Sequence, residues 1–265
     1  MLRMTKLHGL GNDFLVALAQ QNPGLTPSPD VARALCARHT GVGADGLIYA
    51  LAPGGDDADV HMVLLNADGS EAEISGNGIR CLAQAVLREQ GRGEGDVLVE
   101  TVGGLRHLRT VKGDVDGELW TQVDMGEPTA GPPLTPEAMA FDAERRTTLD
   151  IGNPHVVFLV ADPRAVDLTE HGPVLERSFP AGINVHVVTA TSTEDLDMRV
   201  WERGVGITNA CGSGAVAAAV AAHAWGVVGS LATVHMPGGD AVVEIDGPRA
   251  LLTGPSAFIA EVVVP

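Results

Sequence analysis

Two short stretches each place a side chain capable of acid–base chemistry directly before a glycine-rich turn. In EISGNGIRC (residues 73–81) Ser75 precedes the turn, and in NACGSGAV (residues 209–216) Cys211 takes the matching place. If each turn begins a helix, its unpaired N–H groups and partial positive charge can hold an anion such as a carboxylate. The same field lowers the pKa of a thiol, so we expect a lowered pKa at Cys211.

Two such turns acting on one small anionic molecule could remove a proton from one face of a carbon and return it to the other. That chemistry is racemisation or epimerisation without a cofactor. Other uses of glycine-rich turns fit less well. GNGIRC lacks the third glycine of a dinucleotide fingerprint, and GVGITNACGSG lacks the Gly-Lys-Ser/Thr of a phosphate loop. The histidines in HVV and HMP have no zinc-ligand spacing and are expected to be structural or exposed, so we expect no metal.

The elements that must position these turns occur twice along the chain. Gly11-Asn12 begins GNDFLV, and Gly152-Asn153 begins GNPHVVFLV. A polar residue, Asn66 or Glu202, ends a strand nine residues before Ser75 or Cys211 respectively. This ordered repetition predicts a duplication that produced two similar α/β domains.

Local signals predict the helices. One is expected from a Ser28 N-cap and Pro29 to Thr40-Gly41, one over residues 76–89, one over 168–177, and one after Cys211. The segment 112–119, KGDVDGEL, is expected to form a hairpin tip. We expect residues 1–112, with a C-terminal strand at 255–265 returning to them, to form one half and residues 113–254 the other.

Composition narrows the class of protein. The 265 residues are 45% hydrophobic, enough for a substantial core, and the formal net charge is −17. An acidic chain without a basic stripe is a poor partner for nucleic acid. Three cysteines without paired spacing favour a reducing compartment. The start lacks the apolar stretch of a signal peptide, and no run suits a membrane span, so a cytoplasmic location is expected.

Six motifs together resemble the diaminopimelate epimerase family: LHGLGNDFLV, TGVGADGLI, NADGSEAEISGNGIRC, GNPHVV, GINV and ERGVGITNACGSGA. They occur in that family's order from residue 7 to residue 215. The resemblance implies two similar α/β domains, related by pseudo-two-fold symmetry, each with a curved, barrel-like sheet around a central helix and with the active site between them. It also implies interconversion of LL- and meso-diaminopimelate without pyridoxal phosphate or another cofactor, in lysine and peptidoglycan biosynthesis. A homodimer is the expected assembly.

The resemblance also assigns roles. It places Ser75 and Cys211 at the two acid–base positions, with His155 and Glu202 beside them, and Gly76-Asn77 and Gly212-Ser213 as backbone cradles. The side chains expected to bind the substrate's charged groups are Asn12, Asn66, Asn153, Asn184, Glu202 and Arg203. From the residues alone, each carboxamide could instead cap a turn or strand end, and His155 could equally be a packed strand histidine.

Ser75 departs from the family, which has a second catalytic cysteine there. Cys81 lies six residues into the expected helix and Cys36 in the middle of another, so both are expected to be packing residues. Three explanations fit the serine: an engineered replacement, a natural variant that uses Cys211 as the sole strong base, or a changed reaction. A one-base isomerase or lyase of the same fold, and a silent amino-acid-binding homologue, therefore remain alternatives.

Overall fold

The computed structural model describes residues 1–72, 75–113, 115 and 117–265. The chain forms two compact units, one of Met1–Val123 with Gly254–Pro265 and one of Asp124–Thr253. Within the described ranges, no helix is both long and apolar enough to span a lipid bilayer.

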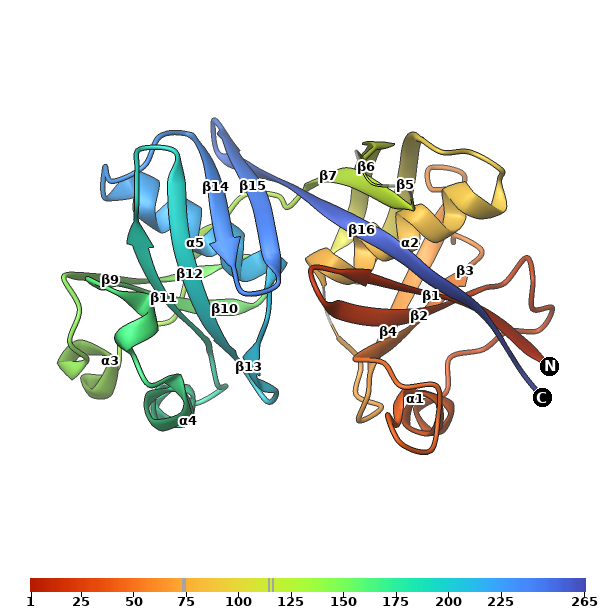
Figure 1. The fold of residues 1–265 in the computed structure, drawn as a ribbon, viewed down its shortest axis with the longest axis horizontal. Helices are drawn as coiled ribbons and strands as arrows, with labels where there is room; N and C mark the ends of the chain where they lie inside the picture. Colours follow the sequence, from red (N-terminus) through yellow and green to blue (C-terminus); the bar gives the residue numbers. More distant parts are fainter. Residues whose placement is uncertain (73–74, 114, 116) are drawn as a thin grey trace. The chain divides into compact units, whose positions relative to one another are not determined.

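The first unit is a closed barrel of eight strands, in the order β1-β2-β3-β4-β5-β6-β7-β16, with β16 pairing back to β1 (Figure 1). Its helix α2 (Gly76–Glu89) contacts β1 through β6, so it occupies the barrel interior, and α1 (Pro29–Cys36) packs on β3 and β4. The strands are β1 (Leu2–Gly9), β2 (Asn12–Leu18), β3 (Gly46–Leu51), β4 (Val60–Asn66), β5 (Gly95–Thr101), β6 (Gly104–Lys112), β7 (Glu118–Asp124) and β16 (Arg249–Val264).

The second unit wraps a sheet around α5 (Gly212–Ala224), with strand order β16-β15-β14-β12-β11-β10-β9-β8 and β13 paired to β12. Its strands are β8 (Thr129–Ala130), β9 (Arg145–Asp150), β10 (Pro154–Leu159), β11 (Asn184–Ala190), β12 (Asp195–Glu202), β13 (Gly206–Thr208), β14 (Leu231–Met236) and β15 (Gly239–Asp246). The helices α3 (Pro136–Ala140) and α4 (Leu168–Ser178) and the 3₁₀ helix η1 (Pro163–Ala165) complete it.

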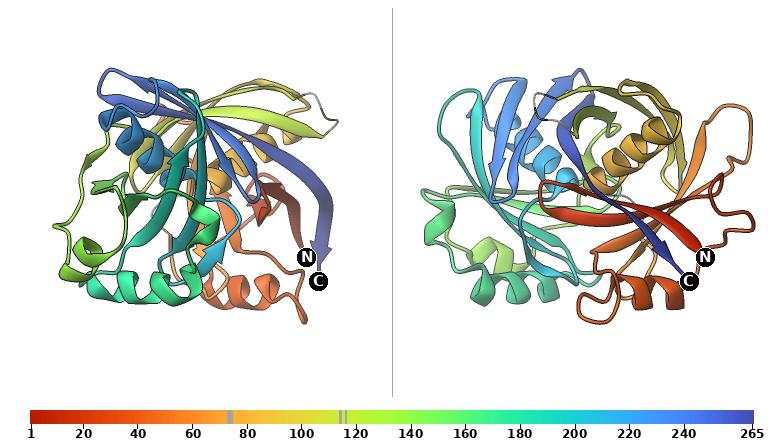
Figure 2. Two further views of the ribbon diagram at one scale, coloured as in Figure 1. Left: turned by 60° about the vertical axis from the view of Figure 1, so that its left-hand side comes forward. Right: turned by 45° about the vertical axis from the view of Figure 1, so that its right-hand side comes forward.

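The two units repeat one pairing scheme. β2–β3 and β10–β11 are parallel, β3–β4 and β11–β12 antiparallel, and β4–β5 and β12–β14 parallel again. The central helix occurs at the same point of the chain in both units: α2 follows β4 and precedes β5, and α5 follows β12 and β13 and precedes β14. Figure 2 shows each central helix enclosed by its own sheet. The predicted fold class, two similar α/β domains each with a curved sheet around a helix, is confirmed.

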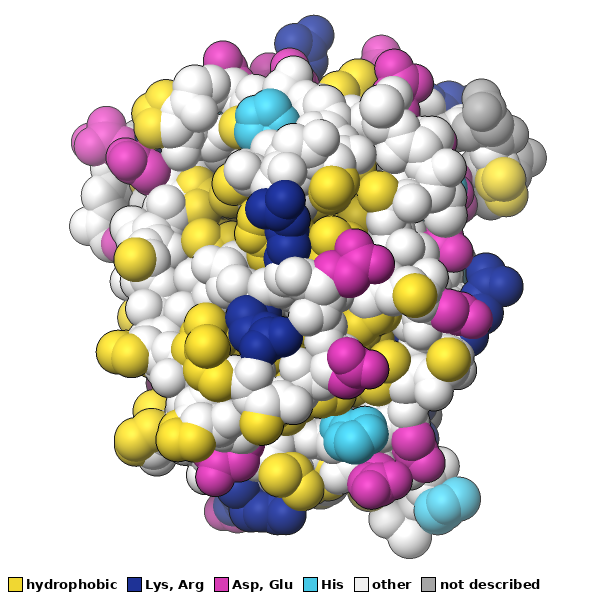
Figure 3. Space-filling view, turned by 90° about the vertical axis from the view of Figure 1, so that its left-hand side faces the viewer, with side chains coloured by type: hydrophobic (Ala, Val, Ile, Leu, Met, Phe, Trp, Pro, Cys, Tyr) yellow, Lys and Arg dark blue, Asp and Glu magenta, His cyan; other side chains and the backbone are white. Residues whose placement is uncertain are grey.

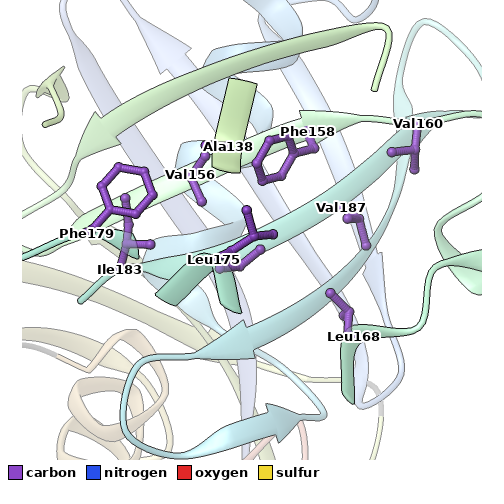
Figure 4. Close-up of a cluster of buried hydrophobic side chains, with 10 residues drawn as sticks. Ala138, Val156, Phe158, Val160, Leu168, Leu175, Phe179, Ile183 and Val187 are labelled. Carbon is purple, nitrogen blue, oxygen red and sulfur yellow. The ribbon is translucent and has the colours of Figure 1, made fainter. Parts of the chain in front are cut away.

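Strand alternation separates an outer and an inner face in each unit. In the second unit, Val156 and Phe158 of β10 and Val185 of β11 join Leu175 of α4 in one hydrophobic cluster (Figure 4). In the first unit, α1 covers the equivalent outer face of β2 and β3. The residues that alternate with these along β10 and β11, including His155 and His186, therefore point inward to the central helix.

Two boundaries differ from the sequence prediction. Helix α1 ends at Cys36 rather than near Thr40, because Ala37 leaves the helical conformation with ψ of 117°. The first unit extends to Val123, beyond the expected division after residue 112, because β7 continues the antiparallel pairing with β6. The expected hairpin tip joins these two strands, although residues 114 and 116 lie outside the described residues.

Glycine allows the central helices to approach the sheets closely. A Cβ built on Gly214 would lie 2.3 Å from His186 Cε1, whereas one on Gly78, at the same helical position in the first unit, would lie 3.4 Å from Ile48 Cδ1. The α5 helix therefore rests directly on an imidazole, and α2 on a more adaptable aliphatic side chain.

This difference predicts unequal effects of one substitution. Gly214→Ala should lower the free energy of unfolding by about 1–3 kcal/mol, the usual cost of overpacking. Gly78→Ala should change it by less than about 1 kcal/mol, because reduced freedom in the unfolded chain offsets mild crowding. Denaturant titration of both variants measures the difference, and equal values would contradict the close contact at His186.

Candidate functional site

In the first unit, Ser75 is the N-cap of α2. Its Oγ accepts a hydrogen bond from Gly78 N–H at 3.0 Å, with extended backbone angles of φ −139° and ψ 114°. The side chain is partly exposed and borders a small cavity of about 10 Å³, roughly the space of one water molecule. The cap uses an oxygen lone pair of Ser75 and leaves its hydroxyl proton available.

A chain of hydrogen bonds fixes the two carboxamides beside this turn. Arg80 donates to Asn77 Oδ1 at 2.6 Å, Asn77 Nδ2 donates to Asn12 Oδ1 at 3.2 Å, and Asn12 Nδ2 donates to Asp45 Oδ2 at 2.7 Å. Asp45 is held in turn by Arg38. The network therefore runs from the barrel interior to the Gly-Asn turn and orients both predicted substrate residues.

Arg80 is fully buried, and its hydrogen bonds are to oxygens of Gly76, Asn77 and Pro255. Burial lowers the pKa of its guanidinium to about 10, which still leaves it charged near neutral pH. Its charge adds to the positive end of α2 and so favours an anion at this turn. Asn66, another predicted residue of this unit, ends β4 and donates to Ser70 Oγ at 3.1 Å.

In the second unit, Cys211 caps α5 in nearly the same conformation as Ser75, with φ −134° and ψ 113°. Its Sγ accepts from Gly214 N–H at 3.4 Å and lies 3.7 Å from Ser213 Oγ. The duplication inferred from the sequence therefore places the two side chains at equivalent positions of the repeated topology.

The lowered pKa predicted for Cys211 is wrong. Burial, followed by the nearby negative charge of Glu202, raises the pKa of the Cys211 thiol well above its usual value. The Gly214 N–H and the Ser213 hydroxyl act in the opposite direction but do not offset burial. Cys211 is therefore a neutral thiol at rest, with the Glu202 carboxylate as a neighbouring proton acceptor. Thr208 Oγ1 donates to Glu202 Oε1 and orients it.

His155 is fully buried and uses both ring nitrogens. Nδ1 lies 2.8 Å from His186 Nε2, and Nε2 lies 2.7 Å from Asn153 Oδ1. Burial lowers the pKa of His155 well below its usual value, and the neighbouring His186 and Arg203 add to the effect. Burial also lowers the pKa of His186 to about 3. Both imidazoles are therefore neutral.

The remaining predicted residues of this unit are held at the ends of β11 and β12. Asn184 donates to the Pro154 carbonyl at 3.0 Å and accepts from Arg203 N–H at 3.0 Å. Glu176 of α4 accepts from Trp201 Nε1 and from Gly204 N–H, and so fixes the chain on both sides of Arg203. The Arg203 guanidinium is only partly exposed and donates to the Ala181 carbonyl at 3.4 Å.

The predicted residues thus gather around the start of each central helix. Asn12, Asn77 and Ser75 form a group in the first unit, with Asn66 ending the strand before the turn. Cys211, Ser213 and Glu202 form a group in the second unit, and the others are Asn153, His155, Asn184 and Arg203. Cys36 and Cys81 are buried and unpaired, as predicted for packing residues, and burial raises their pKa values to about 11 and 12.

The sequence reasoning missed four supporting residues: Asp45, Arg80, Glu176 and His186. Asp45 and Arg80 lie inside two of the quoted motifs, so they could have been examined there. His186 lies two residues after Asn184 on one strand, and the two-residue period of a strand places both on the inner face. Nothing in the local sequence singles out Glu176.

A larger hollow in the second unit, of about 760 Å³, lies at α3, η1 and α4 and includes none of the predicted residues. Its lining includes the acidic side chains of Glu137, Asp142, Glu144, Asp162 and Asp167. On the face shown in Figure 3, acidic, basic and hydrophobic side chains are interspersed. The predicted residues lie at the helix start of each unit and not in this hollow.

Comparison with known proteins by family model and by sequence identity gives the same family. The family model described as diaminopimelate epimerase matches residues 4–130 and 147–259. The diaminopimelate epimerase of Desulfitobacterium hafniense is 40% identical over 277 residues, covering 97% of this chain and 96% of that protein.

Solved structures with lower identity show the same fold. A phenazine biosynthesis protein of the PhzF family from Bacillus anthracis has a TM-score of 0.73 at 16% identity, with 99% of both chains covered. A hydroxyproline epimerase from Agrobacterium vitis has a TM-score of 0.71 at 18% identity, covering 98% of this chain and 91% of that one.

The buried histidine pair predicts a pH dependence of stability. Both folded-state pKa values lie below the unfolded value of about 6.5, so below that pH the unfolded chain binds protons that the folded chain resists. The free energy of unfolding should therefore fall by up to about 2 kcal/mol for each histidine between pH 6.5 and pH 5.

The first unit supplies the control, since Phe14 and Ile48 occupy the positions equivalent to His155 and His186. Denaturant titrations at pH 7 and pH 5 should show a smaller loss of stability in the His155→Phe/His186→Ile variant. If wild type and variant lose the same stability, the histidines are not the buried neutral pair described above.

Proposed function

Because the chain belongs to the diaminopimelate epimerase family, we propose that it interconverts LL- and meso-2,6-diaminopimelate by proton transfer at the α-carbon. Family membership makes the chain an amino-acid epimerase that works without pyridoxal phosphate. The observation that carries the finer proposal is the matched capping of the two central helices by Ser75 and Cys211. The reaction would serve lysine biosynthesis.

Binding of the substrate's α-carboxylate is proposed at the helix starts. The N–H groups of Gly76-Asn77 and Gly212-Ser213 lie in the first turns of α2 and α5, where the helix dipole favours negative charge. Asn12 and Asn153 belong to the equivalent Gly-Asn turns of the two units, so a carboxamide lies beside each helix start. These groups would bind the carboxylate and ammonium of the reacting end.

Arg203 and Glu202 are proposed to bind the distal amino-acid end of the substrate, and Asn66 and Asn184 to bind its ammonium and carboxylate groups. A guanidinium can bind the distal carboxylate in a bidentate manner, and a carboxylate can bind the distal ammonium. Asn184 supports this role by fixing the backbone of Arg203. A substrate lacking the distal amino-acid end would not make these two charged contacts.

Two-base epimerisation requires both capping side chains to act on the same α-carbon. Cys211 would transfer its thiol proton to Glu202, and the resulting thiolate would remove the α-proton. Ser75 would then donate its hydroxyl proton to the opposite face of the carbanion. This last step is the weak one, because a hydroxyl is a far weaker acid than a thiol and is poorly matched for proton transfer near neutrality.

Ser75 also favours a second candidate, a one-base isomerase or lyase that uses Cys211 alone. Such an enzyme would remove the α-proton and then shift or expel a substituent, without returning a proton from the other face. The products separate the candidates: epimerisation inverts the α-carbon, whereas a lyase forms an unsaturated product. A protein that only binds an amino acid does neither.

The Ser75→Cys variant tests the acid–base assignment. It should raise the rate of LL-to-meso conversion by about 100-fold or more, the usual contribution of a positioned acid–base group. The wild-type chain should exchange the α-proton with solvent deuterium faster than it inverts the α-carbon. Cys211→Ala should abolish both processes. Equally fast inversion in wild type and in Ser75→Cys would show that the hydroxyl is as effective as a thiol. That result would contradict the proposal that Ser75 limits the rate of inversion.

The role of Arg203 is testable by calorimetry. Arg203→Ala removes a charged hydrogen-bond partner worth about 1.5–3 kcal/mol, so the affinity for diaminopimelate should fall by about tenfold or more. Arg164→Ala is the matched control, because Arg164 is an exposed arginine of the same unit outside the predicted groups. Equal affinities of the two variants would exclude the proposed contact.

A further inference from the structure

His186, His155 and Asn153 form a row of three polar side chains against the start of α5. The two histidines are fully buried, whereas Asn153 is partly exposed. Only two hydrogen bonds connect the row, one between the rings at 2.8 Å and one from His155 Nε2 to Asn153 Oδ1 at 2.7 Å. The sequence assigned a role to Asn153 and to His155, but none to His186.

Protons can be placed in this row in two ways. A neutral imidazole has one donor nitrogen and one acceptor nitrogen, so the state of one ring fixes the state of the other. In the first arrangement, His186 Nε2–H donates to His155 Nδ1, and His155 Nε2–H donates to the Asn153 carbonyl oxygen. In the second, every bond is reversed and the Asn153 carboxamide turns over, so that its amide nitrogen donates to His155.

The surroundings of His186 favour the first arrangement. Within the described residues its Nδ1 is buried and has no hydrogen-bond partner. A buried N–H without an acceptor is rarer in proteins than an unsatisfied acceptor, so Nδ1 should carry a lone pair. His186 also lies against Gly214 in the first turn of α5, where the positive end of the helix stabilises a lone pair better than a proton.

We propose that His186 is a positioning residue, which acts through His155 to hold the Asn153 carboxamide with its amide nitrogen directed away from the buried pair. No hydrogen bond among the described residues engages that nitrogen. Asn153 is therefore set as a donor, suited to a carboxylate rather than to an ammonium group. This inference rests on the proposed function for its substrate, and it assigns to Asn153 the carboxylate of the reacting amino acid.

The first test measures proton positions without relying on activity. Long-range ¹H–¹⁵N spectra of histidine-labelled protein distinguish neutral rings protonated at Nε2 from those protonated at Nδ1, and His155→Phe and His186→Ile assign the signals. We expect both rings to be protonated at Nε2. A His155 ring protonated at Nδ1 would overturn the proposal, whether or not the chain acts on diaminopimelate.

The second test asks whether His186 acts through Asn153. His186→Ile removes the donor and copies Ile48 of the first unit, while His186→Gln keeps an N–H donor that can reach His155 Nδ1. The isoleucine variant should raise the KM for diaminopimelate about threefold to tenfold, the size of one hydrogen bond, with kcat changed less than about twofold. The glutamine variant should recover most of this loss.

An Asn153→Ala background separates positioning from general damage to the fold. Without the carboxamide, His186→Ile should have little further effect on the KM, because coupled residues are non-additive. An unchanged KM in the single variant, or the same rise in both backgrounds, would overturn the proposal. If wild type neither binds nor epimerises diaminopimelate, the proposed function fails, and the spectra alone then decide the proton direction.

Discussion

The arrangement of this protein depends on the burial of a helix start inside a curved sheet. A helix leaves its first N–H groups without partners, and a buried start must satisfy them from side chains or from a ligand. At α2 and α5, Ser75 Oγ and Cys211 Sγ each accept one of these N–H groups, from Gly78 and Gly214 respectively. The positive end of each helix start is suited to an anion, which links the packing of the sheets to the binding of an anionic group.

Burial also controls the chemistry of the capping side chains. The same enclosure that strengthens electrostatic interactions raises the pKa of the Cys211 thiol, although a helix start by itself would lower it. Cys211 is consequently a neutral thiol at rest, with the Glu202 carboxylate nearby. Ser75, in its partly exposed position, has no comparable partner among the hydrogen bonds described for it.

The two units orient a carboxamide through different hydrogen-bond partners. In the first, the buried Arg80 donates to Asn77, which donates to Asn12, so a permanent positive charge begins the chain of bonds. In the second, two neutral imidazoles lead to Asn153. The apolar Phe14 and Ile48 occupy the positions of these imidazoles in the first unit. A duplicated fold has therefore kept its backbone scheme while its two halves acquired different interior polarity.

The sequence by itself determined the duplication, the start of each central helix and the places of the capping side chains. It could do so because glycine-rich turns, strand alternation and fixed spacings are local features of the chain. Tertiary structure alone decided how deeply Cys211 is buried, and hence the direction of its pKa shift. It also decided that His155 meets His186, which is 31 residues away, and that β7 extends the first unit to Val123. These properties come from contacts between distant segments and from exclusion of water, neither of which a local pattern of residues specifies.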